Sequence, residues 1–561
     1  MTTVHSGMSF NLIDVPWILV QRRDGPVEEV SLLDLFARAH ELRGVVGEVP
    51  TQTFAITRLL LAILRRALDG PRTIEDWARW WRAPTLPIDE VRTYLEHFRH
   101  RFDLLSPETP FYQVADLRTA KGEFSGLEKL IADVPVGAPY FTTRLGSGIA
   151  RISFAEAARW VVHCQAFDPS GIKSGAVGDP RVKGGKGYPI GTGWAGMLGG
   201  ILVEGQSLRE TLLLHLIPDS ELADVDLMVD LPVWERPPDT AAQDDDVPVR
   251  EGLPEKEDPR PSGPCDLYTW QSRRIRLFYD ADGVYGVLIA NGDRLTPQNR
   301  HPHEPMSAWR RSTAQEKKHG GTVYMPREHD PERSIWRGLE AILTEETSSR
   351  QGSEAAPFRR PEVLTWISTA RDEGVLEERY QIRTRAIGML YGSQSSTTAE
   401  IIDDAVSMPA QLLAEAGREL RATVLAAVVD AEEGADALGN LAANLATASG
   451  GDGASARDQA RRLAYATLDR PYRRWLASLN VDTPALDERR RWQHAACYLI
   501  SRLGKQLVEQ AGPAAWRGRR IDRGKGEVWD LNTATADSWF RNRLRRIYPY
   551  AYETRPEEVA A

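Results

Sequence analysis

The sequence has few cysteines and no long apolar run. Only Cys164, Cys265 and Cys497 occur among 561 residues, and they lie far apart. An odd and scattered set excludes a disulfide framework or a structural zinc knot as the basis of the fold. No stretch of about 18 apolar residues is present, so we predict no membrane span. The first residues lack the pattern of a secretory signal, and we therefore expect a cytoplasmic protein.

The sequence also lacks the motifs that would identify an enzyme. Neither H-E-x-x-H nor G-x-S-x-G occurs. The Walker A spacing fails because Lys186 is followed by Gly187, and because no glycine precedes Lys173-Ser174. His301 and His303 flank a proline and have no cysteine nearby, which is typical of turn histidines. We therefore predict no catalytic residue, no metal site and no cofactor.

An excess of positive charge is absent as well. The chain has 70 Lys and Arg against 79 Asp and Glu, a net charge of -9, which does not favour a dedicated nucleic-acid binder. Binding follows the local field, however, so one basic surface is enough. Basic residues concentrate in the last quarter of the chain, at 489–491, 517–525 and 541–546. They predict a positively charged helical surface that fits a nucleic-acid backbone.

Hydrophobic patterning divides the chain into two regions. Helical periodicity over 51–68 and strand alternation on both sides of Asp280–Gly283 predict mixed structure in the first region. After about residue 400 the composition becomes rich in Ala, Leu, Arg and Glu at helical spacing. We predict an α+β fold, with a large mixed domain over 1–398, including long loops, followed by a four-helix bundle over 399–561.

A glycine-rich run over 171–193 is the most informative feature. It contains Lys173, Gly175 and Gly178, and then Lys183, Gly184, Gly185, Lys186 and Gly187. Glycines let backbone amides approach a ligand closely, and lysines add positive charge. A loop of this length inside a domain is typical of a functional or a disordered segment. The residues alone therefore leave two interpretations open, a phosphate- or groove-contacting loop and a flexible surface loop.

Three features together resemble the CasA family, the large subunit of the type I-E CRISPR Cascade surveillance complex. The opening segment Phe10-Asn11-Leu12-Ile13-Asp14, followed by Pro16-Trp17-Ile18, is similar to the start of that family. The segment from Pro50 to Ile63 resembles its first long helix. The order of glycine-rich loop, His-Pro-His segment, Tyr-x-x-Gln segment and helical C-terminal region also matches along nearly the whole chain.

The resemblance implies roles for particular residues. The glycine-rich run would enter the minor groove of the protospacer-adjacent motif (PAM), through either 173–178 or 183–187. Arg294 is the basic residue nearest to the position of a family lysine that also enters this groove. Gln394, with Ser393 before it, matches a wedge that separates the first base pairs. Phe141, Thr142 and Thr143 correspond to the segment that docks on the 5′ end of the guide RNA and on neighbouring subunits.

The resemblance further implies a non-catalytic subunit of an RNA-guided complex. Its partners would be the double-stranded DNA target, the guide RNA, the other Cascade subunits and a helicase-nuclease. Two alternatives remain open at this point. One is a cytoplasmic enzyme that binds a phosphorylated small molecule through the glycine-rich loop. The other is a scaffold whose basic patches only contact partner subunits.

Overall fold

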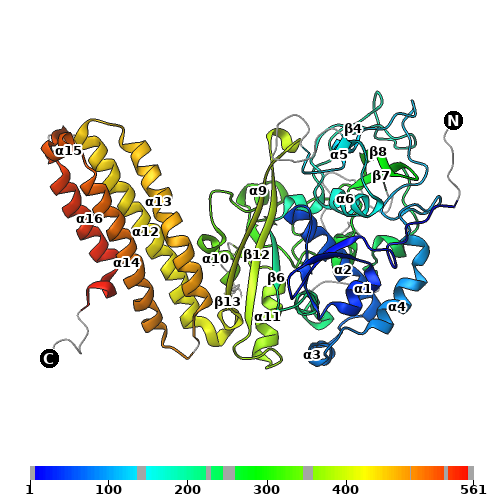
Figure 1. Cartoon of the computed structure of the whole chain (residues 1–561), viewed down its shortest axis with the longest axis horizontal. Helices are drawn as coiled ribbons and strands as arrows, with labels where there is room; N and C mark the ends of the chain where they lie inside the picture. Colours follow the sequence, from blue (N-terminus) through cyan, green and yellow to red (C-terminus); the bar gives the residue numbers. More distant parts are fainter. Residues whose placement is uncertain are drawn as a thin grey trace. The chain divides into compact units, whose positions relative to one another are not determined.

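The computed structural model describes residues 7–134, 147–222, 229–243, 260–344, 358–480, 482–522 and 528–553. The chain forms two compact units. The first consists of Met1–Arg333, Thr344–Ala370 and Arg383–Ala405, and the second of Ser334–Leu343, Arg371–Ile382 and Val406–Ala561. Strands and helices mix in the first unit and long helices fill the second, which confirms the predicted α+β fold with a helical C-terminal region (Figure 1). No described helix is both long and apolar enough to cross a bilayer.

The first unit begins with a small antiparallel sheet of order β2-β1-β3. Its strands are β1 (Ile18–Arg22), β2 (Val27–Val30) and β3 (Leu42–Val45). Helix α1 (Leu32–Arg38) connects β2 to β3, and its N-cap Ser31 accepts a hydrogen bond from the Asp34 amide at 3.2 Å. Because β3 lies at the end of the strand order, its outer side faces away from β1 and is available to other parts of the unit.

Helix α2 (Pro50–Leu68) is the central helix of the first unit. Periodicity predicts one apolar face, but every side chain from Thr51 to Arg65 is buried. The polar Arg58 is buried because both of its terminal nitrogens donate to Glu304 at 2.8 Å, and Trp194 donates to the same carboxylate at 2.7 Å. A buried charge needs such a partner. The sequence therefore predicts the helix correctly, but not its burial on all sides.

A long hairpin and a helix form the base of the glycine-rich region. Strands β7 (Arg273–Asp280) and β8 (Gly283–Asn291) pair antiparallel, as the alternation predicts. Helix α6 (Phe154–Phe167) packs against both strands and against α2. Helix α6 ends three residues before the glycine-rich run, with Asp168 as its C-cap, so the entry to the run is fixed by a buried helix.

A second sheet has the order β13-β12-β6, with β6 (Gly200–Glu204), β12 (Gln381–Tyr391) and β13 (Thr398–Pro409). The two long strands are joined by a tight turn that holds Ser393 and Gln394. A third sheet has the order β10-β9-β11. The remaining main elements of this region are α3 (Ile74–Arg82), α4 (Ile88–His97), α7 (Leu208–His215), α8 (Pro264–Tyr268), β9 (Trp309–Arg311), α9 (Thr313–His319), β10 (Tyr324–Pro326), β11 (Phe358–Arg359) and α11 (Glu362–Asp372).

The second unit is built around α12 (Arg418–Ser449), which packs against α13 (Gly453–Ala477), α14 (Ala485–Glu509) and α16 (Thr533–Ile547). Gly450, in the left-handed conformation, ends α12. Short elements α10 (Glu340–Leu343), α15 (Pro513–Arg517), β14 (Arg519–Asp522) and β15 (Val528–Leu531) complete this unit. The expected domain boundary after residue 398 lies at the start of β13, whereas the chain enters the second unit for the last time at Val406.

Candidate nucleic-acid interface

The glycine-rich run folds into a narrow hairpin. Strand β4 (Lys173–Ser174) pairs with β5 (Lys186–Gly187). In the segment that leads into β5, Lys183 and Lys186 exchange backbone hydrogen bonds of 3.1 and 3.2 Å around a two-residue tip. Gly184 and Gly185 at the tip have φ of 59° and 73°. Two successive residues of positive φ are required for a type I′ turn, which explains the paired glycines. Lys183 and Lys186 are exposed on either side of a tip that carries no side chain.

A buried carboxylate holds the base of this hairpin. Asp168 forms ion pairs with Lys173 and, at 2.5 Å, with Arg273. Burial by itself would raise the pKa of Asp168, but the two cations outweigh it and hold that pKa below its usual range. The side chain of Lys173 is only 14% exposed. Lys173 therefore supports the loop from inside, and its ammonium is not presented to solvent as those of Lys183 and Lys186 are.

Arg273 joins the two ends of the glycine-rich run. In addition to Asp168, its guanidinium donates to the carbonyl oxygens of Pro169 at 3.2 Å and Gly191 at 2.7 Å. The Gly193 amide also donates to the Asp168 carbonyl at 2.9 Å. A run of more than twenty residues is thus closed at its base by one buried side chain. Sequence reasoning missed Arg273, although an arginine at an inward position of an alternating strand indicates a buried partner.

The hairpin is also attached to the end of β8. Arg181 pairs with Asp179 and donates to the carbonyls of Asn291 and Gly292 at 3.2 and 2.9 Å. In return, the Asn291 side chain donates to the Tyr188 carbonyl at 2.6 Å. Arg294 follows three residues after Asn291 and is exposed. The structure therefore brings the glycine hairpin and the Arg294 loop together, as two segments of one platform.

The β12–β13 turn reaches the same platform. Tyr391 at the end of β12 donates to the Phe167 carbonyl at 2.7 Å, one residue before Asp168. A Cβ atom placed on Gly171 would lie 3.9 Å from the Ser396 side chain. Ser393 and Gln394 are exposed at the turn. Gln394 and Ser395 adopt φ of 56° and 53°, and the Gly392 amide closes the turn on the Thr397 carbonyl at 2.8 Å.

The remaining candidates do not join this platform. Phe141, Thr142 and Thr143 lie outside the described residues. His301 and His303 lie in a turn, where the His301 ring packs edge-on against Trp309 and Tyr324. Burial, with Arg359 and His303 nearby, lowers the pKa of His301 to about 3. Within the described ranges, no three His, Cys, Asp or Glu residues form a group that could hold a metal ion.

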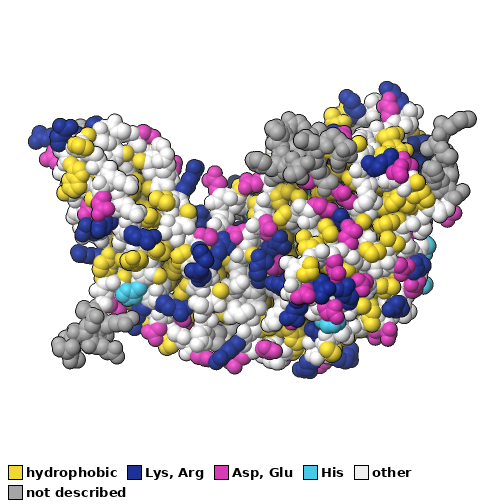
Figure 2. Space-filling model, in the orientation of Figure 1, with side chains coloured by type: hydrophobic (Ala, Val, Ile, Leu, Met, Phe, Trp, Pro, Cys, Tyr) yellow, Lys and Arg dark blue, Asp and Glu magenta, His cyan; other side chains and the backbone are white. Residues whose placement is uncertain are grey.

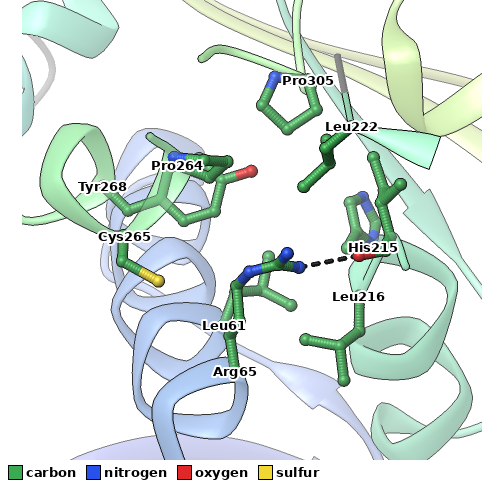
Figure 3. A pocket seen from close by; sticks show the side chains of 10 residues that line it. Leu61, Arg65, His215, Leu216, Leu222, Pro264, Cys265, Tyr268 and Pro305 are labelled. Carbon is green, nitrogen blue, oxygen red and sulfur yellow. Dashed lines mark hydrogen bonds between the residues drawn. The ribbon is translucent and has the colours of Figure 1, made fainter. Parts of the chain in front are cut away.

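A pocket lined by residues of α2, α7 and α8 contains Cys265 and His215, which lie on opposite sides of it (Figure 3). Burial raises the pKa of the Cys265 thiol and lowers that of His215 to about 4. His215 also uses both ring nitrogens, with the Thr211 carbonyl at 2.8 Å and the Val203 amide at 3.1 Å. The thiol is therefore held in its protonated form, and both His215 ring nitrogens are already engaged, so the pair lacks the features of an activated nucleophile and its base.

Basic residues of the second unit differ in how they are used. Arg489 is internal, because it pairs with the buried Asp430 at 2.7 Å. By contrast, several arginines of α15, β14 and α16 are exposed: Arg517, Arg519, Arg520, Arg541, Arg543, Arg545 and Arg546. Three of these pair with nearby carboxylates, so their charges are partly balanced. Exposed basic residues therefore occur at the end of α15, on β14 and around α16. Arg490 and Arg491 of the 489–491 cluster are exposed as well, and residues 523–527 lie outside the described part of the chain.

Comparison with known proteins gives a consistent result. The family model of CRISPR-associated protein Cse1 matches residues 11–503. The CRISPR-associated protein CasA/Cse1 of Thermus thermophilus is 32% identical over 514 residues, which cover 91% of this chain and 89% of that protein. The crystal structure of Thermobifida fusca Cse1 is 53% identical, covers 97% of this chain and 99% of that chain, and has a TM-score of 0.87. A chain of a solved CRISPR RNA-guided surveillance complex shares the fold, with 19% identity, coverage of 96% and 99%, and a TM-score of 0.67.

Proposed function

This chain belongs to the CRISPR-associated Cse1 family, and from that premise we propose that it is the non-catalytic large subunit of an RNA-guided surveillance complex. In this proposal it recognises the PAM in the DNA minor groove, helps to open the duplex and recruits a helicase-nuclease. The guide RNA and the other Cascade subunits are its further partners, and the cytoplasm is its location. A relative of the same fold in a CRISPR RNA-guided surveillance complex supports the assembly.

One observation carries the DNA-binding part of the proposal. Three exposed segments lie on one platform: the glycine hairpin is anchored at Asp168 and Arg273, the Gln394 turn is tied to the end of α6, and the Arg294 loop is joined to the hairpin through Arg181. The minor groove of B-DNA is only about 6 Å wide. A type I′ tip without side chains suits such a groove, and Lys183 and Lys186 on either side suit its phosphates. Minor-groove contacts are degenerate, so a backbone-lined tip is compatible with several related motifs.

The Gln394 turn is the element that we assign to strand opening. It is exposed, short and tied to the platform through Tyr391. Non-glycine residues with positive φ cost about 1 kcal/mol or more, and persist where surrounding contacts hold them. Inserting a side chain beside a base step costs a few kcal/mol of unstacking, which guide–target pairing would offset. The exposed arginines of α15, β14 and α16 would then contact the separated strands.

A reconstitution experiment tests the proposal. Binding of matched duplexes, with and without a candidate PAM, is compared for complexes assembled with and without this chain at two salt concentrations. We expect tight binding to require both the chain and the motif, and to weaken steeply with salt. If the chain adds nothing, and a phosphorylated small molecule instead protects it against thermal unfolding through the glycine loop, the enzyme alternative replaces this proposal. A salt-independent gain would favour the scaffold alternative.

A further inference from the structure

A polar cleft in the first unit lies apart from the platform. Its volume is about 330 Å³. One wall consists of β1, the edge strand β3 and the first turn of α2, and the other consists of the sheet formed by β6, β12 and β13. The lining residues are Gln21, Arg43, Gly44, Val45, Val46, Gly47, Pro50, Thr53, Glu204, Arg383, Arg385 and Asp403. Lys and Arg side chains gather on the surface over β12 (Figure 2).

Strand geometry brings the charges of this cleft to one face. Arg383 and Arg385 are two residues apart on β12 and therefore point to the same side of the sheet. Glu204 on β6 is the cross-strand partner of Arg383, and it forms ion pairs with Arg383 and with Arg385. Asp403 on β13 pairs with Arg385 at 2.5 Å. Arg385 therefore forms ion pairs with both Glu204 and Asp403, and the charges of these two carboxylates are balanced within the sheet.

Arg43 and Arg383 keep donors for a ligand. Within the described ranges, Arg383 makes one hydrogen bond, from Nη1 to Glu204, and its side chain is 42% exposed. Arg43 makes one hydrogen bond, from Nη1 to the Gly205 carbonyl at 2.5 Å. The Nε and Nη2 groups of both arginines remain available. With three arginines against two carboxylates, the cleft carries one excess positive charge.

The opposite wall provides space and further positive potential. A Cβ atom on Gly44 would meet nothing within 4 Å. Its cross-strand partner Gln21 lines the cleft, so a side chain at Gly44 would enter the same space. Pro50 and Thr53 belong to the first turn of the 19-residue α2, whose N-terminus carries a partial positive charge. Val45, Val46 and Pro50 add an apolar surface beside these polar groups.

We propose that this cleft binds a phosphate monoester of nucleotide size, with the phosphate between Arg43 and Arg383 and the apolar part against Val45, Val46 and Pro50. Arginine presents paired donors that match a phosphate group. The volume lies at the lower end of the range of about 300–1,000 Å³ found for small-ligand sites, and exceeds what inorganic phosphate needs. The source is a free nucleotide or the phosphorylated end of a nucleic-acid strand. This site is independent of the proposed PAM platform, because it uses none of the platform residues.

Calorimetry on the full-length chain tests the proposal. The probes are AMP, adenosine, and hexathymidine with either a 5′ phosphate or a 5′ hydroxyl. We expect AMP to bind and adenosine not to bind. Binding of the 5′-phosphorylated oligonucleotide, but not of its 5′-hydroxyl form, identifies the source as a strand end. Binding of AMP alone identifies a free nucleotide. If neither AMP nor the phosphorylated oligonucleotide binds, the proposal is wrong.

Three variants test separately the positive charge of the cleft and its open volume. Arg383→Ala and Arg43→Ala should each weaken binding by about tenfold or more, because each removes a charge-assisted hydrogen bond. Gly44→Leu should abolish binding while keeping every charge, and Gly321→Leu, at another open position of the same unit, should leave binding unchanged. Equal binding by the wild type and Gly44→Leu would overturn the proposal. All four variants should retain motif-dependent duplex opening, so failure here leaves the proposed function intact.

Discussion

The two compact units each contain a buried aspartate that joins distant segments, but the pKa values of the two aspartates are shifted in opposite directions. Asp168 in the first unit lies between two cations, and its pKa is below the usual range. Asp430 in the helical unit has one cation, Arg489, together with the Gln493 amide at 2.9 Å, and burial raises its pKa to about 6. Two ion pairs thus overcome desolvation where one does not. The glycine-rich region is thus closed by fully charged pairs, whereas the Asp430 connection in the helical unit contains a carboxylate whose burial is less completely compensated.

The largest expected effect separates these two carboxylates directly. Asp168→Asn would leave Lys173 and Arg273 buried without a counter-charge, and we expect the first unit to lose about 3–5 kcal/mol of stability. Asp430→Asn keeps a hydrogen-bonding group and removes a partly protonated acid, so the helical unit should change by less than about 1 kcal/mol at pH 6. Urea unfolding, monitored by amide hydrogen exchange in each unit, measures the change in unfolding free energy for both variants. Equal losses of stability in the two variants would contradict the proposed difference between the two aspartates.

A second substitution tests how the glycine-rich run is closed. Arg273→Ala removes the donors to Asp168, Pro169 and Gly191, and we expect a loss of about 2–4 kcal/mol with faster amide exchange across 168–193. Arg276→Ala, on the same strand, removes one hydrogen bond to the Leu117 carbonyl and should cost about 1 kcal/mol or less. Unchanged exchange in the Arg273 variant would show that the run is held by other contacts.

The buried histidines of the first unit and Asp430 of the helical unit should contribute pH dependence of opposite sign. Burial lowers the pKa of His163 to about 3 and that of His215 to about 4, so the unfolded first unit binds more protons below pH 6.5 and its stability falls with falling pH. For Asp430, with a pKa of about 6, the folded state binds the proton first. Asp430 should therefore contribute a gain of about 1–3 kcal/mol as the pH falls from 7 towards 4, and the difference between the wild type and Asp430→Asn isolates this contribution. Hydrogen exchange at pH 7 and pH 5 tests this, and parallel trends would contradict it.

A smaller effect distinguishes lysines within the glycine-rich run. Replacing Lys183 and Lys186 by alanine should weaken binding of the reconstituted complex to PAM-bearing duplex by about tenfold, with stability unchanged, because both side chains are exposed. Lys173→Ala should instead lower stability, because Lys173 is paired inside the unit. If the double variant binds the duplex normally, the two lysines are not the DNA contacts, and Arg294 becomes the next candidate for a contact to the PAM.

The sequence predicts local features of this molecule better than its long-range pairs. Periodicity is sufficient for α2 and for the β7–β8 hairpin, because each depends on neighbouring residues. The Asp168–Arg273 pair spans 105 positions, and no local pattern indicates it. For the same reason Lys173 is predicted as a DNA contact together with Lys183, although the structure uses it internally. The positions of Gln394 and Arg294 beside the glycine run became visible only through backbone contacts of Tyr391 and Arg181.

The most direct test of the proposed function concerns the Gln394 turn. Duplex binding and strand opening are measured on the same reconstituted complex, the first by mobility shift and the second by fluorescence of 2-aminopurine placed next to the PAM. Gln394→Ala should reduce opening by about tenfold while duplex binding changes less than about twofold, because the exposed side chain acts only when the strands separate. Ser396→Ala serves as the control for turn geometry, because it removes a hydrogen bond to the Ser393 carbonyl in the same turn and leaves Gln394 in place. Equal losses of binding and opening would contradict the account.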